Sequence, residues 1–225
     1  MIFNQSHIRK FQLPVFLLFL LVFTTGSINA QETRFGVKAG LNYASVVGDL
    51  TQGFKFRFSG YGGLFLEIEF SDKFSFQPEL LYSSQGFQLS SDLQSIETGN
   101  TAPEENDFRT NVQFNYITIP VLGKFAINDR MAVEFGPQFG FLLNQVTKIK
   151  NLDQRNNSTA NSRSTISGNF QLDYGAAAGL SYKLSDRFAL APRFYIGLRN
   201  RLEGLEGNLQ NYNAAIQLGV NYTFL

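Results

Sequence analysis

The sequence predicts an all-β protein, folded as an eight-stranded antiparallel up-and-down transmembrane β-barrel. Three observations predict this fold. The last stretch of the chain alternates between apolar and polar side chains, and seven earlier stretches do the same. The connections between these stretches alternate between long and short. The polar side of each stretch carries few charges, which is unusual for a surface in contact with water.

The last stretch, residues 212–225, has the clearest alternation. A period of two places successive side chains on opposite faces of a strand. The apolar face carries Tyr212, Ala214, Ile216, Leu218, Val220, Tyr222 and Phe224, and the other face carries Asn213, Ala215, Gln217, Gly219, Asn221 and Thr223. Aromatic rings at both ends of an apolar face are typical of a strand that crosses a membrane.

The first 30 residues read as a cleaved signal peptide rather than as part of the fold. His7, Arg9 and Lys10 give a positively charged start, and residues 13–23 form a short apolar core that ends in small and polar residues. A transmembrane anchor is the alternative, but this apolar run is too short to span a bilayer. We therefore expect residues 31–225 to form a single outer-membrane β-barrel domain.

Seven more alternating stretches precede the last one. They cover residues 34–45, 58–70, 74–84, 112–125, 131–144, 170–184 and 188–198. Three of the connections are tight turns with a shared pattern of polar, Asp, basic and apolar residues: Ser71 to Phe74, Asn128 to Met131 and Ser185 to Phe188. The other connections are longer. Outer-membrane barrels have short periplasmic turns and long extracellular loops, and an even strand count places both termini in the periplasm.

Alternation alone does not decide which face of the barrel is apolar, because a soluble lipocalin-like barrel alternates as well. The low charge of the polar faces favours lipid outside, with Gly, Ala, Ser, Asn and Gln filling a narrow bore. We therefore predict that Leu66, Phe139 and Leu218 point outward. The charged residues of the polar faces are Lys38, Glu67, Glu69, Glu79, Lys124, Glu134, Asp173, Lys183 and Arg193.

These nine side chains are the candidate site, and we interpret them as a lumenal ion network. Interior acids and bases are nearly balanced in number, as expected when each buried charge needs a partner. The alternative is that Glu67, Glu69 and Glu79 form an acid/base pair or a cation site.

Composition excludes several classes of chemistry. His7 is the only histidine and the chain has no cysteine, so mechanisms that use a histidine base and zinc sites built from His or Cys are not available to the mature chain. Removing Arg9 and Lys10 from the 19 basic residues leaves the mature chain with a net charge of about −1, which does not suggest nucleic-acid binding. We predict no catalytic residue, no cofactor and no metal.

Two long polar segments carry opposite charge. Residues 85–111 are acidic, whereas residues 146–169 are basic through Lys148, Lys150, Arg155 and Arg163. We expect both to be loops. They either bind a partner at the mouth of the barrel or are solvated loops with a chance bias in charge.

Three motifs carry a family resemblance: FGVKAGLNYAS at 35–45, QPELLYSSQG at 77–86 and NYITIPVL at 115–122. With them, the mature chain resembles the PorT-like outer-membrane β-barrel proteins of the Bacteroidetes. Thr118 stands where that family more often has an acid. The resemblance implies an eight-stranded barrel in the outer membrane of a Gram-negative cell, and one family member acts in secretion.

The function that the sequence favours is a non-catalytic outer-membrane barrel with a structural or partner-binding role. Its expected partners are outer-membrane lipid, the barrel-assembly machinery during insertion and a protein at the extracellular loops. Three alternatives stay open: a narrow pore for small solutes, a component of a secretion system, and a soluble lipocalin-like binder.

Overall fold

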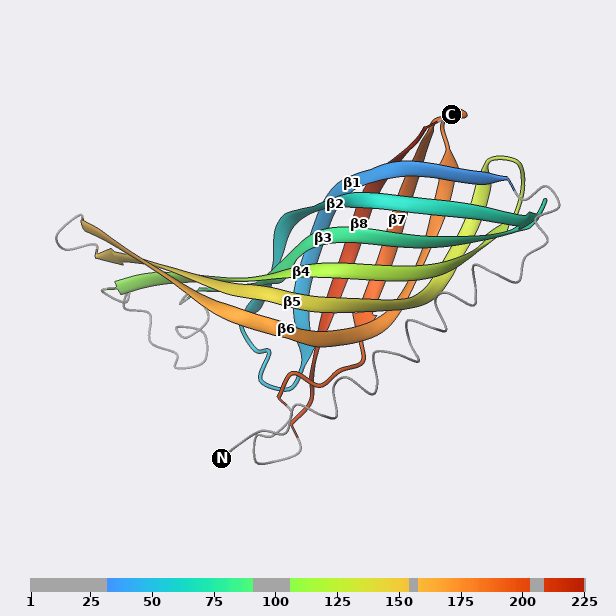
Figure 1. Ribbon diagram of the computed structural model, residues 1–225. Coiled ribbons are helices and arrows are strands. Elements are labelled where there is room, and N and C mark those ends of the chain that lie inside the picture. The colour runs from blue at the N-terminus through green and yellow to red at the C-terminus, as the bar shows by residue number, and fades with distance from the viewer. Residues whose placement is uncertain (1–31, 91–105, 154–157, 203–208, 225) are drawn as a thin grey trace. The chain divides into compact units, whose positions relative to one another are not determined.

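The computed structural model describes residues 32–90, 106–153, 158–202 and 209–224, in which eight antiparallel strands form a closed barrel (Figure 1). Each strand pairs with the next along the chain, and β1 pairs with β8 to close the ring. The strands are β1 (Thr33–Gly48), β2 (Phe54–Ser71), β3 (Phe74–Ser90), β4 (Asn106–Ala126), β5 (Met131–Asp153), β6 (Ser158–Lys183), β7 (Phe188–Gly197) and β8 (Asn211–Phe224). The predicted fold class is confirmed. No helix among the described residues is long and apolar enough to cross a membrane.

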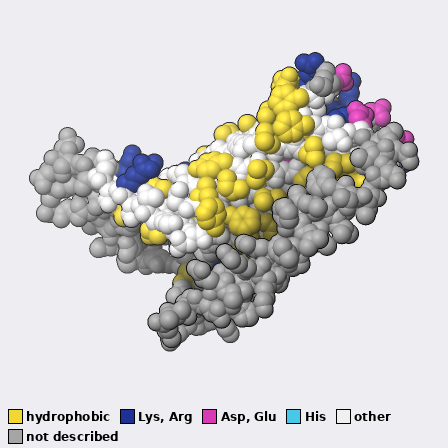
Figure 2. All heavy atoms as spheres, in the orientation of Figure 1, with side chains coloured by type: hydrophobic (Ala, Val, Ile, Leu, Met, Phe, Trp, Pro, Cys, Tyr) yellow, Lys and Arg dark blue, Asp and Glu magenta, His cyan; other side chains and the backbone are white. Residues whose placement is uncertain are grey.

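The apolar faces of the strands point away from the bore. Leu218 is 56% exposed and Phe139 is 39% exposed, and Leu66 is half-buried. Gln217 and Asn221, which alternate with the apolar residues of β8, are buried. Figure 2 shows hydrophobic side chains gathered over the middle of the barrel, with charged side chains toward its two ends. The predicted orientation is therefore confirmed, and an apolar band of this kind suits contact with acyl chains.

Aromatic rings lie in contact near the strand ends. Next to the tight turns, Phe70 packs on Phe74 and Phe188 packs on Tyr222, with ring centroids 6.0 and 5.0 Å apart. At the other end of β1 and β2, the rings of Tyr43 and Phe58 are 4.6 Å apart. These positions match the two interfacial girdles that flank the apolar band of a membrane barrel.

Each of the three tight turns contains the same kind of hydrogen bond. The side-chain oxygen of the first turn residue accepts the backbone N–H three residues later: Ser71 from Phe74, Asn128 from Met131 and Ser185 from Phe188. Ser and Asn favour this local bond, which holds the chain in a turn. The pattern common to the three turn sequences thus corresponds to a common geometry.

Much of the two long polar segments predicted to be loops is strand, and this corrects the sequence interpretation; residues 91–105 and 154–157 lie outside the described residues. The ladder between β5 and β6 continues to Asp153↔Ser158, and that between β3 and β4 continues to Ser90↔Arg109. Residues 146–153 and 158–169 are therefore strand, as are 85–90 and 106–111. Most residues of these segments are polar, so the alternation of apolar and polar side chains is weak there, and backbone pairing with a neighbour holds them.

Close approach of three strands requires glycine at position 40. A Cβ built on Gly40 lies 2.7 Å from the Gly219 Cα and 2.8 Å from Tyr61 Cε1, and it overlaps the Leu218 carbonyl oxygen. We expect Gly40→Ala to lower the free energy of unfolding by about 1–3 kcal/mol, because backbone atoms of β8 must move. Urea titration in detergent micelles, followed by heat-modifiable gel migration, measures the change.

Gly60→Ala is the matched control for this substitution. Its Cβ meets nothing closer than the Gly40 carbonyl oxygen at 3.8 Å. We expect its unfolding free energy to stay within about 0.5 kcal/mol of the wild-type value. If the two alanine variants unfold at the same urea concentration, close packing between β1 and β8 is not what requires glycine at position 40.

Candidate functional site: a charged network across the bore

The candidate site is a group of four buried charged side chains that come from alternate strands of the ring. Lys38 lies on β1, Glu79 on β3, Glu134 on β5 and Arg193 on β7. Each residue is at most 3% exposed. Each belongs to the polar face of its strand, and in a closed barrel those faces converge on the axis. Residues of β1 and β5, and of β3 and β7, therefore approach one another from opposite walls.

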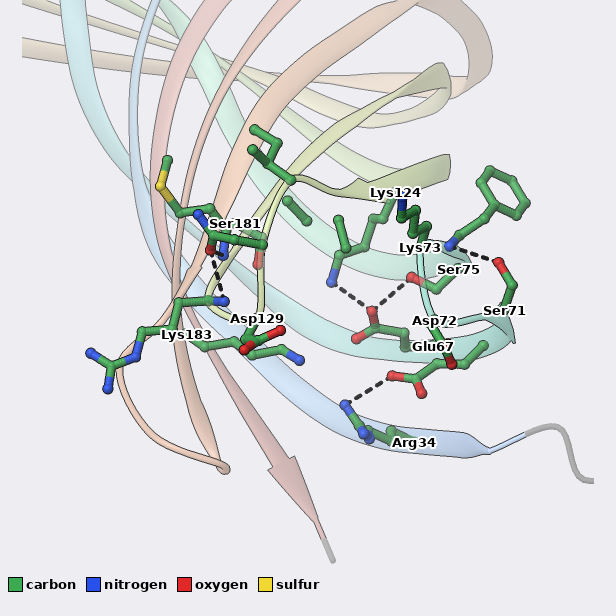
Figure 3. Close-up of a pocket in the computed structure, with 18 residues that line it drawn as sticks. Arg34, Glu67, Ser71, Asp72, Lys73, Ser75, Lys124, Asp129, Ser181 and Lys183 are labelled. Atoms are coloured by element: carbon green, nitrogen blue, oxygen red, sulfur yellow. Dashed lines mark hydrogen bonds and ion pairs between the residues drawn. The ribbon is translucent and has the colours of Figure 1, made fainter.

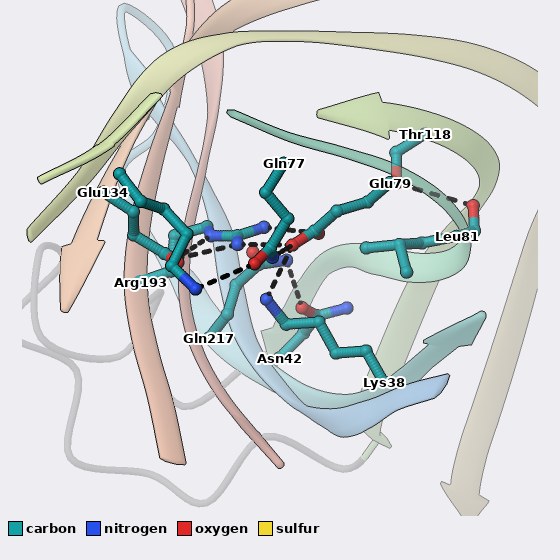
Figure 4. A network of polar contacts seen from close by, with 10 residues as sticks. Lys38, Asn42, Gln77, Glu79, Leu81, Thr118, Glu134, Arg193 and Gln217 are labelled. Atoms are coloured by element: carbon teal, nitrogen blue, oxygen red, sulfur yellow. Dashed lines mark hydrogen bonds and ion pairs between the residues drawn. The ribbon is translucent and has the colours of Figure 1, made fainter. Parts of the chain in front are cut away.

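Glu79 is the centre of this network (Figure 4). Its Oε1 accepts from Lys38 Nζ at 3.0 Å, and its two oxygens accept from Arg193 Nη2 and Nη1 at 2.8 Å each. The contact with Arg193 is bidentate, the geometry in which a guanidinium binds a carboxylate most strongly. Arg193 Nε also donates to Glu134 Oε1 at 2.8 Å. Two acids and two bases thus neutralise one another in the middle of the bore.

One amide side chain extends the network, and a separate pair of amides lies in the bore as well. Gln77 donates to Glu79 at 2.5 Å and accepts from Lys124 Nζ at 3.0 Å. Gln217 Nε2 donates to Asn42 Oδ1 at 2.8 Å. The sequence interpretation missed these amides, because it considered charged residues only. Their one signal in the sequence is their position on the polar face.

A second layer of ion pairs lies toward the tight turns (Figure 3). Lys124 Nζ is 2.8 Å from Glu67 Oε1, which also accepts from Ser75 Oγ at 2.9 Å. Glu69 pairs at 2.9 Å with Arg34, a residue outside the predicted set. These side chains line a cavity of about 540 Å³ at this end of the barrel.

Two predicted members of the network lie apart from it, which corrects the sequence interpretation. Asp173 accepts a hydrogen bond from Asn213 Nδ2 near the other mouth, and Lys183 is exposed at the rim by the tight turns. Neither forms an ion pair with any described residue. Both residues lie on the polar face of β6, but Lys183 is the last residue of the strand, whereas Asp173 lies ten residues earlier, next to the end of the ladder with β7 at Gly175. The face on which a residue lies does not indicate its depth along the bore.

Asp173 belongs to a smaller polar pocket at the long-loop mouth. The pocket measures about 170 Å³ and is lined by Tyr116, Arg199 and Arg201 among others. Arg201 donates to the Tyr116 hydroxyl at 3.0 Å, and its guanidinium carbon lies 3.9 Å from the centre of the Phe114 ring. Along β5, Glu134 stands between Ala132, which lines the large cavity, and Leu142, which lines this pocket. The four-charge network therefore separates the two.

The three carboxylates of the alternative acid/base or cation site do not converge. Glu79 is bound by two cations, and Glu67 and Glu69 each have a separate basic partner. Within the described part of the chain, no three His, Cys, Asp or Glu residues are grouped so that they could hold a metal ion.

Comparisons with solved structures show similar barrels at low sequence identity. Ail, the attachment invasion locus protein of Yersinia pestis, is 15% identical, with 86% of this chain and 99% of that chain covered and a TM-score of 0.42. Neisserial surface protein A is 13% identical, with coverage of 84% and 97% and a TM-score of 0.39. The N-terminal barrel domain of Pseudomonas aeruginosa OprF is 13% identical, with coverage of 87% and 100% and a TM-score of 0.38.

No curated protein sequence matches the chain significantly. A family model described as "Outer membrane protein beta-barrel domain" matches residues 29–203, which is most of the chain. The matched region contains seven of the eight strands and all four charged residues of the network. The chain belongs to the outer membrane protein beta-barrel domain family and is an integral outer-membrane β-barrel protein.

Proposed function

We propose that this protein is a sealed, non-catalytic outer-membrane scaffold that binds a partner at its long-loop end. The observation that carries the proposal is the network of Lys38, Glu79, Glu134 and Arg193, which joins opposite walls of the barrel. Ions would have to break several charge-assisted hydrogen bonds to pass. The side chains that fill an eight-stranded barrel leave little room for bulk diffusion.

The orientation in the membrane is part of the proposal. The tight turns face the periplasm together with both termini, and the long connections face outward, as is usual for barrels of this type. We further propose that residues 1–30 are a cleaved signal peptide and that the barrel-assembly machinery inserts residues 31–225. Residues 1–31 lie outside the described part of the structure.

The absence of catalysis is proposed on chemical grounds. The mature chain has no histidine and no cysteine, and each carboxylate of the network is bound by a cation or an amide. A carboxylate held by Lys and Arg is a poor base, because protonating it breaks those ion pairs. Its role in this proposal is structural.

Within the family, we propose that the chain belongs to the PorT-like branch of the Bacteroidetes. The motifs at 35–45, 77–86 and 115–122 support this placement. A role in secretion is not part of the proposal, because one fold hosts many functions.

Planar-bilayer recording tests the seal. We expect purified protein, inserted in a bilayer, to show no steady conductance, because the network closes the bore. Arg193→Ala together with Glu79→Ala removes the bidentate pair, and we expect this double variant to conduct small ions if it folds. Steady channels in the wild-type protein would contradict a sealed scaffold and favour the narrow pore.

A further inference from the structure

Strands β5 and β6 project well beyond the closed ring. β6 pairs with β7 only between Gly175↔Gly197 and Lys183↔Ala189, whereas its pairing with β5 runs on to Ser158 (Figure 1). Arg163 precedes Gly175 by twelve residues, so at the usual rise it lies roughly 35–40 Å along β6 from the last pair with β7. Even a strongly tilted strand carries this residue past the lipid headgroups.

Positive charges oppose one another on this projection. Lys148 of β5 is directly opposite Arg163 of β6, and Lys150 lies two residues further on the same face. All three side chains are exposed. Directly opposed residues of an antiparallel pair have Cβ atoms roughly 5 Å apart, and like charges at that distance destabilise the pair.

None of these three charges is neutralised by the described part of the chain. Lys148, Lys150 and Arg163 form no ion pair or hydrogen bond there with their side chains. Inside the bore and at its tight-turn end, by contrast, Lys124 pairs with Glu67 and Arg34 pairs with Glu69. The projection therefore differs from the bore, where basic side chains have acidic partners.

A fourth positive charge lies nearby, and the groups that accept hydrogen bonds from it among the described residues are neutral. Arg57 donates to the side-chain oxygens of Asn111 at 2.9 Å, Gln113 at 3.2 Å and Ser84 at 3.2 Å. Asn111 is directly opposite Lys148 in the ladder between β4 and β5. Amide and hydroxyl oxygens orient the guanidinium without cancelling its charge. We call Arg57, Lys148, Lys150 and Arg163 the basic surface.

We propose that the basic surface binds a soluble anionic polysaccharide that carries sulfate or carboxylate groups. The proposal rests on the proposed function in that it needs the long-loop end to face outward. An anionic chain supplies the counter-charge that the opposed Lys148 and Arg163 lack. A polymer is favoured over a small anion because the charges are spread over three strands, β2, β5 and β6, and because an exposed sheet has no enclosing walls.

The neighbouring residues decide between a sugar polymer and other polyanions. The uncharged residues beside the three exposed bases on the same face include Asn111, Asn161 and Thr165, whose amides and hydroxyl suit sugar hydroxyl groups. In the described ladders no aromatic residue is paired with Lys148, Lys150 or Arg163, so single-stranded nucleic acid finds no stacking platform opposite them. Membrane lipid is disfavoured by the distance along β6 between Arg163 and the last pair with β7.

Binding to dextran sulfate tests the proposal, with neutral dextran of the same length as the reference probe. We expect the full chain in non-ionic micelles to bind only the sulfated polymer, and more weakly as salt is raised from about 50 to 200 mM. The triple variant Lys148→Gln, Lys150→Gln, Arg163→Gln is expected to lose about tenfold or more in affinity. Undiminished binding by this variant would overturn the proposal.

The matched control is Lys73→Gln, Arg130→Gln, Arg187→Gln, which removes the same charge at the tight turns. We expect its affinity to stay within about twofold of the wild-type value, since it lies more than a Debye length away. An equal loss in both triple variants means that net charge alone drives binding. The proposal is also contradicted if a single-stranded oligonucleotide binds the wild-type protein as tightly as dextran sulfate does, and if the Lys148, Lys150, Arg163 variant loses that binding.

A footprint on the wild-type protein makes the test independent of variants. We expect dextran sulfate to slow acetylation of Lys148 and Lys150 but not of Lys73. Equal protection of all three lysines would overturn the assignment of the binding site to the basic surface. The bilayer recordings keep the two proposals distinct. If the protein shows no conductance and does not bind dextran sulfate, only the proposed ligand is rejected. If it conducts ions and binds dextran sulfate, only the sealed scaffold is rejected.

Discussion

Glu79→Ala is expected to lower the free energy of unfolding by about 3–5 kcal/mol. The substitution leaves Lys38 and Arg193 buried without their shared acid. Both contacts of Glu79 are fully desolvated, with side chains at most 1% exposed. Removing one partner of a buried pair costs far more than the pair itself contributes, because an uncompensated charge remains. Urea titration in micelles, read by heat-modifiable gel migration, gives the change.

Glu69→Ala is the control, because it removes the same side chain and the same charge. The pair that Glu69 forms with Arg34 is about one-third exposed, so water screens it and we expect a loss of at most about 1 kcal/mol. If Glu79→Ala and Glu69→Ala unfold at the same urea concentration, the network does not stabilise the barrel. Its structural role in the proposed scaffold would then have to be abandoned.

Leu218→Arg is expected to destabilise the barrel by about 2–4 kcal/mol, because it places a charge against acyl chains near the bilayer midplane. Leu218 is exposed between Ile216 and Val220, in the middle of the apolar face of β8. In a soluble barrel the same face would meet water, and an exposed arginine would change stability by about 0.5 kcal/mol or less. Folding into phospholipid vesicles and urea titration separate the two cases.

Leu50→Arg is the matched control for this prediction. Leu50 is 65% exposed but lies in the connection between β1 and β2, outside the band of strands. We expect it to unfold like the wild-type protein. Equal stability of both arginine variants and the wild type would argue that the apolar face does not lie in lipid.

The strand count, the pairing order and the outward face could all be predicted from the sequence. Each depends on a local rule, since a period of two fixes which side chains share a face and turn residues fix where a hairpin reverses. The polar ends of β5 and β6 were not predicted as strand. Strands were predicted from a difference in polarity between their two faces, and at these ends the two faces are similar in polarity.

The sequence alone therefore determined that nine charged side chains lie on the polar faces of a barrel. Only the tertiary structure decided which of them meet. Depth along the bore depends on the stagger between strands and on bulges such as the register shift at Asn115 and Tyr116, and these arise from contacts between distant parts of the chain. For that reason Glu79 reaches Arg193, 114 residues away, whereas Asp173 and Lys183, which also lie on the polar face of their strand, form no ion pair with any described residue.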